Sequence, residues 1–308
     1  MHNRTALITG SEGFIGYYLK QLLINCNYRV IGCFYKKKKL KIVKDVIYEF
    51  CDVRKLENLK KILFKYKPNL IFHLAAKSHP FYSFVDPIGT INTNVIGTIN
   101  LLETCKVLNL NPKIIMACSS GQYGSRPYSK LPMKESDLYD PEHIYGLSKV
   151  FQDSLSKQYF KMFKIKTIRA ILFNTSGVGK KHDVFYDICK QFKDQFNNDV
   201  INIKCGNLNN YRDFMHVKDV AEGLLFLSKK GVPGHSYNIG SSNLIKISKI
   251  IDILKSKYKK KILIKIDKNL IRRYDEKFIS ESIKKIKKLG WKPKKKIDDI
   301  IFDMINKN

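Results

Sequence analysis

A tyrosine and a lysine four residues apart, Tyr145 and Lys149, are the pair in this sequence best suited to acid–base chemistry. Residues 144–163 show helical spacing, and positions four apart in a helix lie on one face. A tyrosine has an ordinary pKa of about 10 and is a poor acid–base group at neutral pH. Because a nearby ammonium group stabilises the phenolate, we expect Lys149 to lower the pKa of Tyr145 and to activate it.

The context of this pair is more informative than its spacing, which is common by chance. About 25 residues before Tyr145, a strand predicted at 113–119 ends in Ser119 and Ser120. A glycine-rich loop stands further upstream. The joint occurrence of these features indicates an acid–base site next to a bound nucleotide.

The glycine-rich loop follows a strand predicted at 6–9 and opens a helix predicted at 14–25, as a dinucleotide-binding loop does. We expect one glycine to permit the sharp turn, the next to let the backbone approach the pyrophosphate, and the third to let the helix pack closely on the strand. The N–H groups of the helix N-terminus would hold the phosphates. The residues expected to line the coenzyme site here are Gly10, Gly13, Phe14, Ile15 and Gly16.

The end of the second predicted strand, at 29–35, bears on the choice of coenzyme. An acid at this place binds the adenosine ribose of NAD, and the segment from Gly32 to Lys37 contains none. Lys36 or Lys37 could instead pair with the 2′-phosphate of NADP. We therefore expect NADP(H), with NAD(H) as the alternative if these lysines only form a solvated loop.

The elements that carry these residues alternate between strand and helix, which predicts an α/β protein with a doubly wound parallel Rossmann sheet. Further strands are expected at 46–51, 70–75 and 166–173, and a further helix at 89–108. Beyond residue 173 the alternation weakens, which indicates a smaller C-terminal lobe.

The expected division of the chain follows from this change of pattern. We predict a dinucleotide-binding domain over 1–173 and about 213–240, and a substrate-binding lobe over about 174–212 and 241–308. The composition, with 44% hydrophobic and 12% aromatic residues, is that of a globular protein.

The formal net charge of +30 raises the question of a nucleic-acid partner. Only eight of the 57 basic residues are arginine, and lysines spread over many predicted helix faces, so we expect solvated charge and no nucleic acid. No apolar run reaches the length of about 18 residues that a membrane helix needs, and no leader precedes the first strand, so we expect no membrane partner and a cytoplasmic location. The seven scattered cysteines predict reduced thiols and no metal site.

Several motifs together resemble the extended short-chain dehydrogenase/reductase family, the NAD(P)-dependent epimerases, dehydratases and reductases of nucleotide sugars. The resemblance extends over essentially the full chain. The residues that carry it are Gly10, Gly13 and Gly16, Cys51-Asp-Val53, His73-Leu-Ala-Ala76, Asn94-Val-Ile-Gly-Thr98, Ser119-Ser-Gly-Gln-Tyr-Gly124, Tyr145 with Lys149, and Arg212-Asp-Phe214.

The resemblance implies roles for individual residues. Asp52 and Val53 would flank the adenine, and the nicotinamide side would be lined by Leu74, Ala75 and Ala76. Ser119 would complete a catalytic triad, and Lys149 would also hold the nicotinamide ribose. By resemblance we also expect a homodimer, formed through the helices at 89–108 and 144–163.

Within the family, enzymes of GDP-linked sugars are the most similar. Ala75-Ala-Lys-Ser-His-Pro-Phe-Tyr-Ser-Phe84 resembles a segment of GDP-mannose 4,6-dehydratases, with Lys77 in place of the usual Gln. Three other segments resemble GDP-4-keto-6-deoxymannose reductases, with Thr175 in place of the usual His; they are Phe173-Asn-Thr-Ser-Gly-Val-Gly179, Gly206-Asn-Leu208 and Gly290-Trp-Lys-Pro293.

Position 121 separates the activities found in these enzymes. By resemblance, dehydratases have a Glu there that handles the proton at C5 and the loss of water at C6, and fucose synthases have an epimerising Cys nearby. This chain has Gly121, preceded by Ser120. Cys118 points away from the face of Ser119 and is expected to be a core thiol. The site is therefore expected to transfer hydride without elimination.

The leading hypothesis is an NADPH-dependent reductase of a 4-keto-6-deoxy sugar nucleotide, with GDP as the favoured nucleotide. Tyr145 would protonate the oxygen at C4, and Ser119 would hydrogen-bond that oxygen. His73, inside a buried strand, is expected to be a hydrogen-bonded core residue. The residues expected to hold the substrate are Ser78, His79, Ser120, Asn174, Arg212 and Arg272.

Other interpretations stay open. Arg212 could simply pair with Asp213. The chain could be a nucleotide-sugar 4-epimerase or 4,6-dehydratase with tightly held NAD(P), although Gly121 and the missing acid after the second strand argue against this. It could also be a basic dinucleotide-binding scaffold without chemistry, which the intact Ser119, Tyr145 and Lys149 set disfavours.

Overall fold

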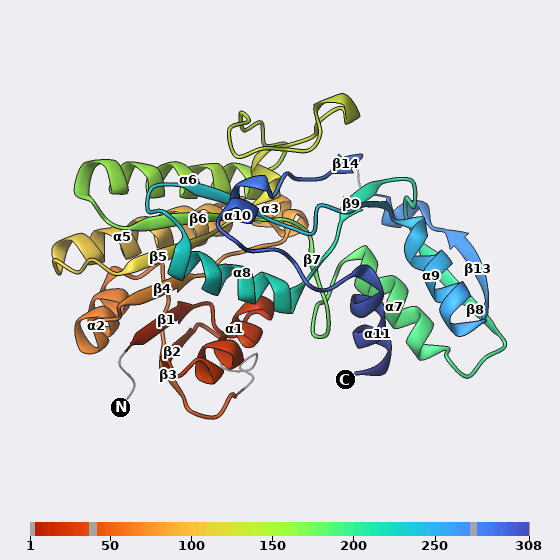
Figure 1. Ribbon diagram of the computed structural model, residues 1–308, viewed down its shortest axis with the longest axis horizontal. Helices are drawn as coiled ribbons and strands as arrows, with labels where there is room; N and C mark the ends of the chain where they lie inside the picture. The colour runs from red at the N-terminus through yellow and green to blue at the C-terminus, as the bar shows by residue number, and fades with distance from the viewer. Residues whose placement is uncertain (1–3, 37–41, 272–275, 308) are drawn as a thin grey trace.

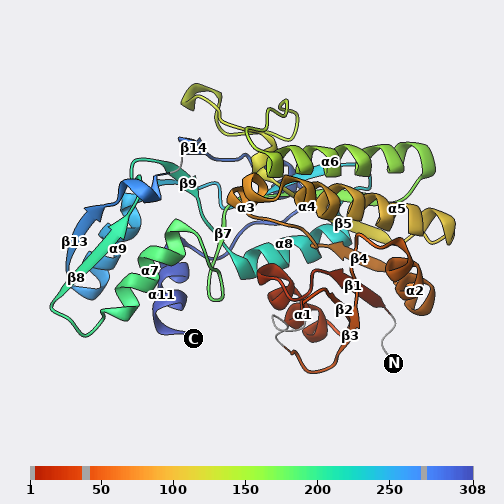
Figure 2. The ribbon, with the colours of Figure 1, turned by 180° about the vertical axis from the view of Figure 1, so that it is seen from behind.

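The computed structural model describes residues 4–36, 42–271 and 276–307. Figure 1 shows a large lobe built on a central sheet and a small lobe beside it, and Figure 2 shows the same two lobes from behind. The chain begins in the large lobe and ends below the small one.

The central sheet has seven strands, all parallel, in the order β11–β6–β5–β4–β1–β2–β3. Most residues of its strands are buried, because helices cover both faces of the sheet. This is the doubly wound Rossmann sheet that the alternating pattern predicted. The strand bounds are β1 Thr5–Thr9, β2 Arg29–Phe34, β3 Val46–Phe50, β4 Leu70–His73, β5 Lys113–Ser119, β6 Thr167–Leu172 and β11 Ser236–Ile239.

Each face of the sheet has its own buried core. On one face, Leu7 and Ile114 pack with residues of α2 Leu56–Tyr66, α5 Gly97–Val107 and α6 Ile144–Phe163. On the other face, Ile8 and Ile115 pack with residues of α1 Phe14–Asn25, α8 Val217–Lys230 and α10 Lys284–Lys288. Neighbouring strand residues thus alternate between the two cores.

The helix predicted at 89–108 is a run of three consecutive segments, α4 Pro87–Ile91, the π-helical turn η2 Asn92–Ile96, and α5. A π-turn inside a helix often occurs at a functional site. Here it carries Asn94, whose side-chain amide donates to Ser148 Oγ at 2.9 Å and accepts from the Lys77 N–H at 2.8 Å. The turn therefore ties α6 to the loop after β4.

The small lobe has a separate core between helices and a two-stranded parallel sheet. Its helices are α7 Val184–Asp194, α9 Ser248–Tyr258 and α11 Ile297–Asn306, and its strands are β8 Val200–Cys205 and β13 Lys261–Ile266. The remaining short elements are α3 Pro80–Val85, η3 Ser120–Gln122, η4 Tyr128–Lys130, β7 Thr175–Ser176, β9 Tyr211–Asp213, β10 Met215–His216, β12 Leu244–Lys246, η5 Lys268–Leu270 and β14 Phe278–Ile279.

The last part of the chain belongs to both lobes. Ile283, Ile286 and Trp291 are buried in the core of the large lobe that α1 and α8 share. Ile300 and Ile301, on α11, are buried in the core of the small lobe. The two lobes are therefore built from interleaved segments of sequence.

Candidate active site

A cavity of about 1020 Å³ lies at the carboxyl ends of the central strands, where the large lobe meets the small one. Its floor includes the residues that follow β1 and β4, the two strands at which the strand order reverses. Ligands of doubly wound sheets bind at this switch point. The site residues predicted from the sequence line this cavity, except Arg272 and Lys37, which lie outside the described residues.

The glycine loop has the geometry that a bound dinucleotide requires. Gly10 has φ +70°, and a Cβ on it would stand 2.8 Å from the backbone N and Cα of Ala75. A Cβ on Gly16 would stand 2.7 Å from the Gly10 carbonyl oxygen, so the helix and the loop can meet only without side chains there. Gly13 is the N-cap of α1, and no side chain caps this helix end. Its N–H groups are thus placed to receive a phosphate, which fits a dinucleotide coenzyme.

The end of the cavity at which the sequence predicts the adenosine combines acidic, basic and aromatic groups. The Arg54 guanidinium donates to Asp52 at 2.8 and 2.7 Å and lies over the Tyr35 ring, 5.0 Å from its centre. Hydrogen bonds from Arg54 hold the pKa of the Asp52 carboxyl below its usual value. Val53 and Lys36 line the same end. Lys37, the other lysine proposed for the 2′-phosphate, lies outside the described residues.

Tyr145 and Lys149 project from one face of α6 into the cavity, and both are almost fully buried. The Lys149 ammonium stands 5.9 Å from the centre of the Tyr145 ring. It donates to the Ala117 carbonyl and to Gln152 Oε1, each at 2.7 Å. The helical spacing therefore places the two groups together, as the sequence predicted.

The expected lowering of the tyrosine pKa is wrong for this structure. Burial raises the pKa of Tyr145 to about 12, and the hydrogen-bonded Ser119 hydroxyl counteracts that rise only in part. Burial also lowers the pKa of Lys149 to about 8. Removal from water is the main cause of both shifts, because the charged forms of a phenol and of an amine are costly inside the protein. Tyr145 is thus held as a protonated phenol.

The residues next to Ser119 differ in their surroundings. The Ser119 hydroxyl accepts from the Gly121 N–H at 3.3 Å. Cys118 is buried in the core formed with α5 and α6, 3.9 Å from Asp153 Oδ1, and its burial raises the thiol pKa. His73 is also confirmed as a core residue, with its ring nitrogens 2.8 and 3.2 Å from the hydroxyls of Thr9 and Thr98.

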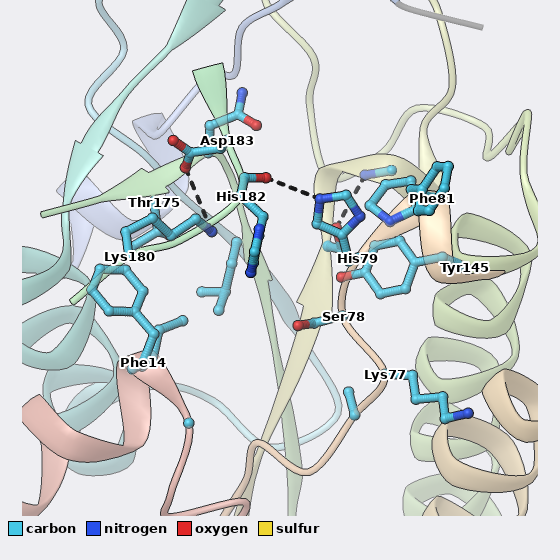
Figure 3. Close-up of a pocket in the computed structure, with 18 of the residues that line it drawn as sticks. Phe14, Lys77, Ser78, His79, Phe81, Tyr145, Thr175, Lys180, His182 and Asp183 are labelled. Atoms are coloured by element: carbon cyan, nitrogen blue, oxygen red, sulfur yellow. Dashed lines mark hydrogen bonds and ion pairs between the residues drawn. The ribbon is translucent and has the colours of Figure 1, made fainter. Parts of the chain in front are cut away.

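Ser78 and His79 line the cavity close to Tyr145 (Figure 3), and Ser120 lines the same cavity. The His79 ring donates through Nε2 to the His182 carbonyl at 3.0 Å, which joins the loop before α3 to the loop before α7. Asn174 has a buried side-chain amide nitrogen without a hydrogen-bond partner. A donor in this position suits a hydroxyl or phosphate oxygen of a substrate.

Arg212 lies at the opposite wall, with Nη2 3.7 Å from Glu276 Oε2. The alternative that Arg212 simply pairs with Asp213 does not describe the contacts of these two residues. Asp213 is fully buried and accepts from the Ser241 N–H at 3.0 Å and the Asn243 N–H at 2.8 Å. Successive residues of β9 point to opposite sides, so Arg212 faces the cavity while Asp213 holds the loop after β11.

The cavity also contains residues that were not expected from the sequence, among them His143, Glu276 and Lys180. His143 caps α6 by accepting from the Gly146 N–H at 2.8 Å, and its ring stacks on Tyr145 with centres 5.8 Å apart. Glu276 lies 3.9 Å from His143 Nε2. Lys180 lies over the Phe14 ring and 3.8 Å from Asp183 (Figure 3). No sequence motif predicts these residues as part of the site, because they come from loops that only the tertiary fold brings together.

Gly121 and His143 share a small space beside Tyr145. A Cβ built on Gly121 would stand 3.1 Å from His143 Cε1, which is tighter than ordinary van der Waals contact. A longer side chain at position 121 would therefore need the histidine to move. The histidine ring fills the place next to the strand end that a carboxylate at 121 would occupy.

Neither a metal-binding cluster nor a membrane-spanning helix is found in residues 4–36, 42–271 and 276–307. No cluster of three or more His, Cys, Asp or Glu side chains with the arrangement of a metal site occurs there. In the same part of the chain, no helix combines the length and apolar character needed to cross a bilayer.

The family model described as GDP-mannose 4,6 dehydratase matches residues 7–304. The chain is 31% identical to a putative UDP-glucose 4-epimerase of Methanocaldococcus jannaschii, with 97% of each chain covered. It is 28% identical to the GDP-6-deoxy-D-mannose reductase of Pseudomonas aeruginosa over 73% of this chain and 75% of that protein. The solved structure of RMD from the same species complexed with NADPH has a TM-score of 0.83 at 24% identity, covering 98% of both chains. The chain therefore belongs to the GDP-mannose 4,6-dehydratase family of extended short-chain dehydrogenases/reductases, the NAD(P)-dependent enzymes that modify nucleotide sugars.

Proposed function

We propose that this chain is an NADPH-dependent reductase of a 4-keto-6-deoxy sugar nucleotide, with a GDP-linked sugar as its substrate. The observation that carries the proposal is the combination of Ser119, Tyr145 and Lys149 with Gly121 in one cavity. The hydride-transfer residues are all present, whereas position 121 offers no acid or thiol for elimination or epimerisation. The similarity to the Pseudomonas reductase supports the same activity.

A nicotinamide coenzyme bound along the glycine loop would supply the hydride. Tyr145, a protonated phenol in its buried site, gives its proton to the oxygen that develops at C4. Ser119 donates a hydrogen bond to that oxygen and so positions the carbonyl beside Tyr145. Lys149 stabilises the phenolate that remains, and its ammonium would also bind the nicotinamide ribose. Tyr145 is protonated at neutral pH, and this is the form that a reductase needs before hydride transfer.

The substrate would extend from this centre toward the small lobe. The Asn174 amide would donate to the sugar or to its phosphate, and Arg212 would face the diphosphate, together with Arg272 from outside the described residues. Ser78, His79 and Ser120 would surround the sugar. We favour NADP(H) as coenzyme, with Lys36 near the 2′-phosphate, and NAD(H) as the alternative.

The test is NADPH consumption on addition of GDP-4-keto-6-deoxymannose to the purified protein. We expect stoichiometric oxidation, followed as loss of NADPH absorbance. The Tyr145→Phe variant should lose roughly 10²–10⁴-fold in rate while it binds coenzyme as the wild type does, because only the proton donor is removed. An inactive wild type would refute this substrate, and an active Tyr145→Phe variant would refute the mechanism.

The second candidate is a nucleotide-sugar 4-epimerase or 4,6-dehydratase with tightly held NAD(P). The similarity to the putative UDP-glucose 4-epimerase favours it. Such an enzyme oxidises and re-reduces one sugar, so it would convert substrate without net loss of NADPH and would retain coenzyme through purification. Product analysis beside the absorbance assay separates the two candidates.

We also propose a homodimer and a cytoplasmic location. The helices proposed for the dimer interface expose apolar side chains, including Ile96, Val107, Leu147, Phe151 and Met162. Side chains of this kind on neighbouring helices suit an interface with a second copy. Sedimentation of the purified protein would test the oligomeric state.

A further inference from the structure

The glycine loop carries an acidic residue, Glu12, whose side chain reaches across to the end of β2. The Tyr35 N–H donates to Glu12 Oε1 at 3.1 Å. The other carboxylate oxygen, Oε2, is buried and has no hydrogen-bond partner. The adjacent Ser11 donates its N–H to the Cys33 carbonyl at 2.9 Å, and its hydroxyl is likewise buried without a partner. The loop and the strand end therefore form one unit with unused hydrogen-bonding capacity.

This unit lies at the adenosine end of the cavity, which Glu12 lines together with Tyr35, Lys36 and Arg54. In a doubly wound sheet, an acid beside the end of β2 binds the 2′-hydroxyl of the coenzyme ribose. The end of β2 itself has no acid in this chain. Glu12 supplies a carboxylate at the same place from a different element.

The charges around Glu12 are balanced rather than uniformly positive. Arg54 is engaged by Asp52 through hydrogen bonds of 2.7 and 2.8 Å, which neutralises much of its charge. Lys36 is exposed. Lys20 is buried, donates to Tyr48 Oη at 3.3 Å and has a pKa lowered by burial to about 8, an effect that the Glu12 carboxylate partly offsets. A 2′-phosphate would thus meet a carboxylate together with the cations.

We propose that Glu12 is a specificity-determining residue for the coenzyme. Its carboxylate accepts a hydrogen bond from the ribose hydroxyls of NAD(H) and repels the 2′-phosphate of NADP(H). The preference for NADP(H) that Lys36 creates is therefore smaller than this cation alone would produce. The proposal rests on the coenzyme site of the proposed function and not on the identity of the sugar.

The test compares Glu12→Gln with the wild type, using full-length protein freed of coenzyme. The amide keeps the size of the side chain and can still accept from the Tyr35 N–H, so the negative charge is lost while the shape is kept. Calorimetry gives the Kd for ADP-ribose and for 2′-phospho-ADP-ribose, which differ only in the 2′-phosphate. We expect Glu12→Gln to bind the phosphorylated ligand about tenfold more tightly and ADP-ribose no more tightly than the wild type.

Two further variants make the outcome decisive. Glu57→Gln removes the same charge from an exposed i,i+3 pair with Lys60 on α2, away from the cavity, and should leave both Kd values unchanged. Glu12→Ser removes the charge with a smaller side chain and should repeat the effect if Glu12→Gln fails to fold.

The proposal is overturned if the ratio of the two Kd values in the Glu12 variants stays within about twofold of the wild-type ratio, since a lost charge must change it. It is also overturned if both ligands weaken equally, because Glu12 would then only shape the loop. If the wild type binds neither ligand, the coenzyme site of the proposed function fails as well. A changed ratio in a protein that reduces no sugar would leave this inference standing and defeat only the proposed reaction.

Discussion

Replacing Gly10 by alanine would test whether the close approach between the glycine loop and the loop after β4 builds the coenzyme site. Gly10 has φ +70°, and the added Cβ would stand 2.8 Å from two backbone atoms of Ala75 and 3.0 Å from the carbonyl carbon of Leu74. Backbone atoms cannot turn aside as a flexible side chain can. The two loops must therefore move apart, and both line the cavity.

The magnitude has two parts. The positive φ costs an alanine about 1–2 kcal/mol, and forcing a methyl group into a packed contact costs about 1–3 kcal/mol more. We expect Gly10→Ala to lower the free energy of unfolding by about 2–5 kcal/mol. A shift of the loop after β4 by a fraction of an ångström should also weaken coenzyme binding by roughly tenfold to a hundredfold.

Gly290→Ala is the matched control. Gly290 also has a positive φ, +103°, but a Cβ there would meet nothing within 4 Å. It should lose only about 1–2 kcal/mol and bind coenzyme normally. Urea denaturation gives the free energies of unfolding, and nicotinamide fluorescence gives the Kd. Equal losses of stability in the two variants, with unchanged coenzyme binding in Gly10→Ala, would refute the reasoning.

Two further predictions concern pH. Lys149 has a pKa lowered to about 8, so its ammonium group is lost as the pH rises through that value, and the rate of reduction should fall; Lys149→Arg, which stays charged, should lack this decline in a pH–rate profile. Burial and the neighbouring Asp213 raise the pKa of Glu281 well above its ordinary value of 4.5, so the folded protein holds a proton that the unfolded chain releases. The free energy of unfolding should therefore decrease as the pH rises above 4.5. Glu281→Gln mimics the protonated acid and should weaken that decrease, which urea titrations at several pH values would measure. If the free energy of unfolding of Glu281→Gln falls with pH as steeply as that of the wild type, the prediction is wrong.

The parts of the fold and the site that could be predicted are those that local sequence determines. The helices at 14–25 and 144–163 have the predicted bounds, because a glycine loop and an apolar repeat define them directly. The spacing of Tyr145 and Lys149 placed both groups on one face of α6. Their position in the cavity followed from the rule that ligands of a doubly wound sheet bind at the carboxyl ends of the parallel strands.

The parts that could not be predicted depend on contacts between distant segments. The pKa of Tyr145 moves upward because the folded chain buries the phenol, and burial is not visible in a four-residue motif. His143 and Glu276 meet only through the fold. Glu12 could be recognised as an acid in the glycine loop, but its contact with Tyr35 depends on how the loop meets β2.

The interleaving of the two lobes limits how this protein can be divided or recombined. The small lobe draws on three separate stretches of sequence, which include α7 with β8, α9 with β13, and α11, while α8, β11 and α10 between them belong to the large lobe. A chimera that borrows substrate recognition from another protein would have to graft all three stretches together. Loss of the last dozen residues would remove α11 and expose the hydrophobic core of the small lobe beside α7 to solvent. The substrate side of the cavity would then be disturbed, although those residues lie far from Tyr145 in the chain.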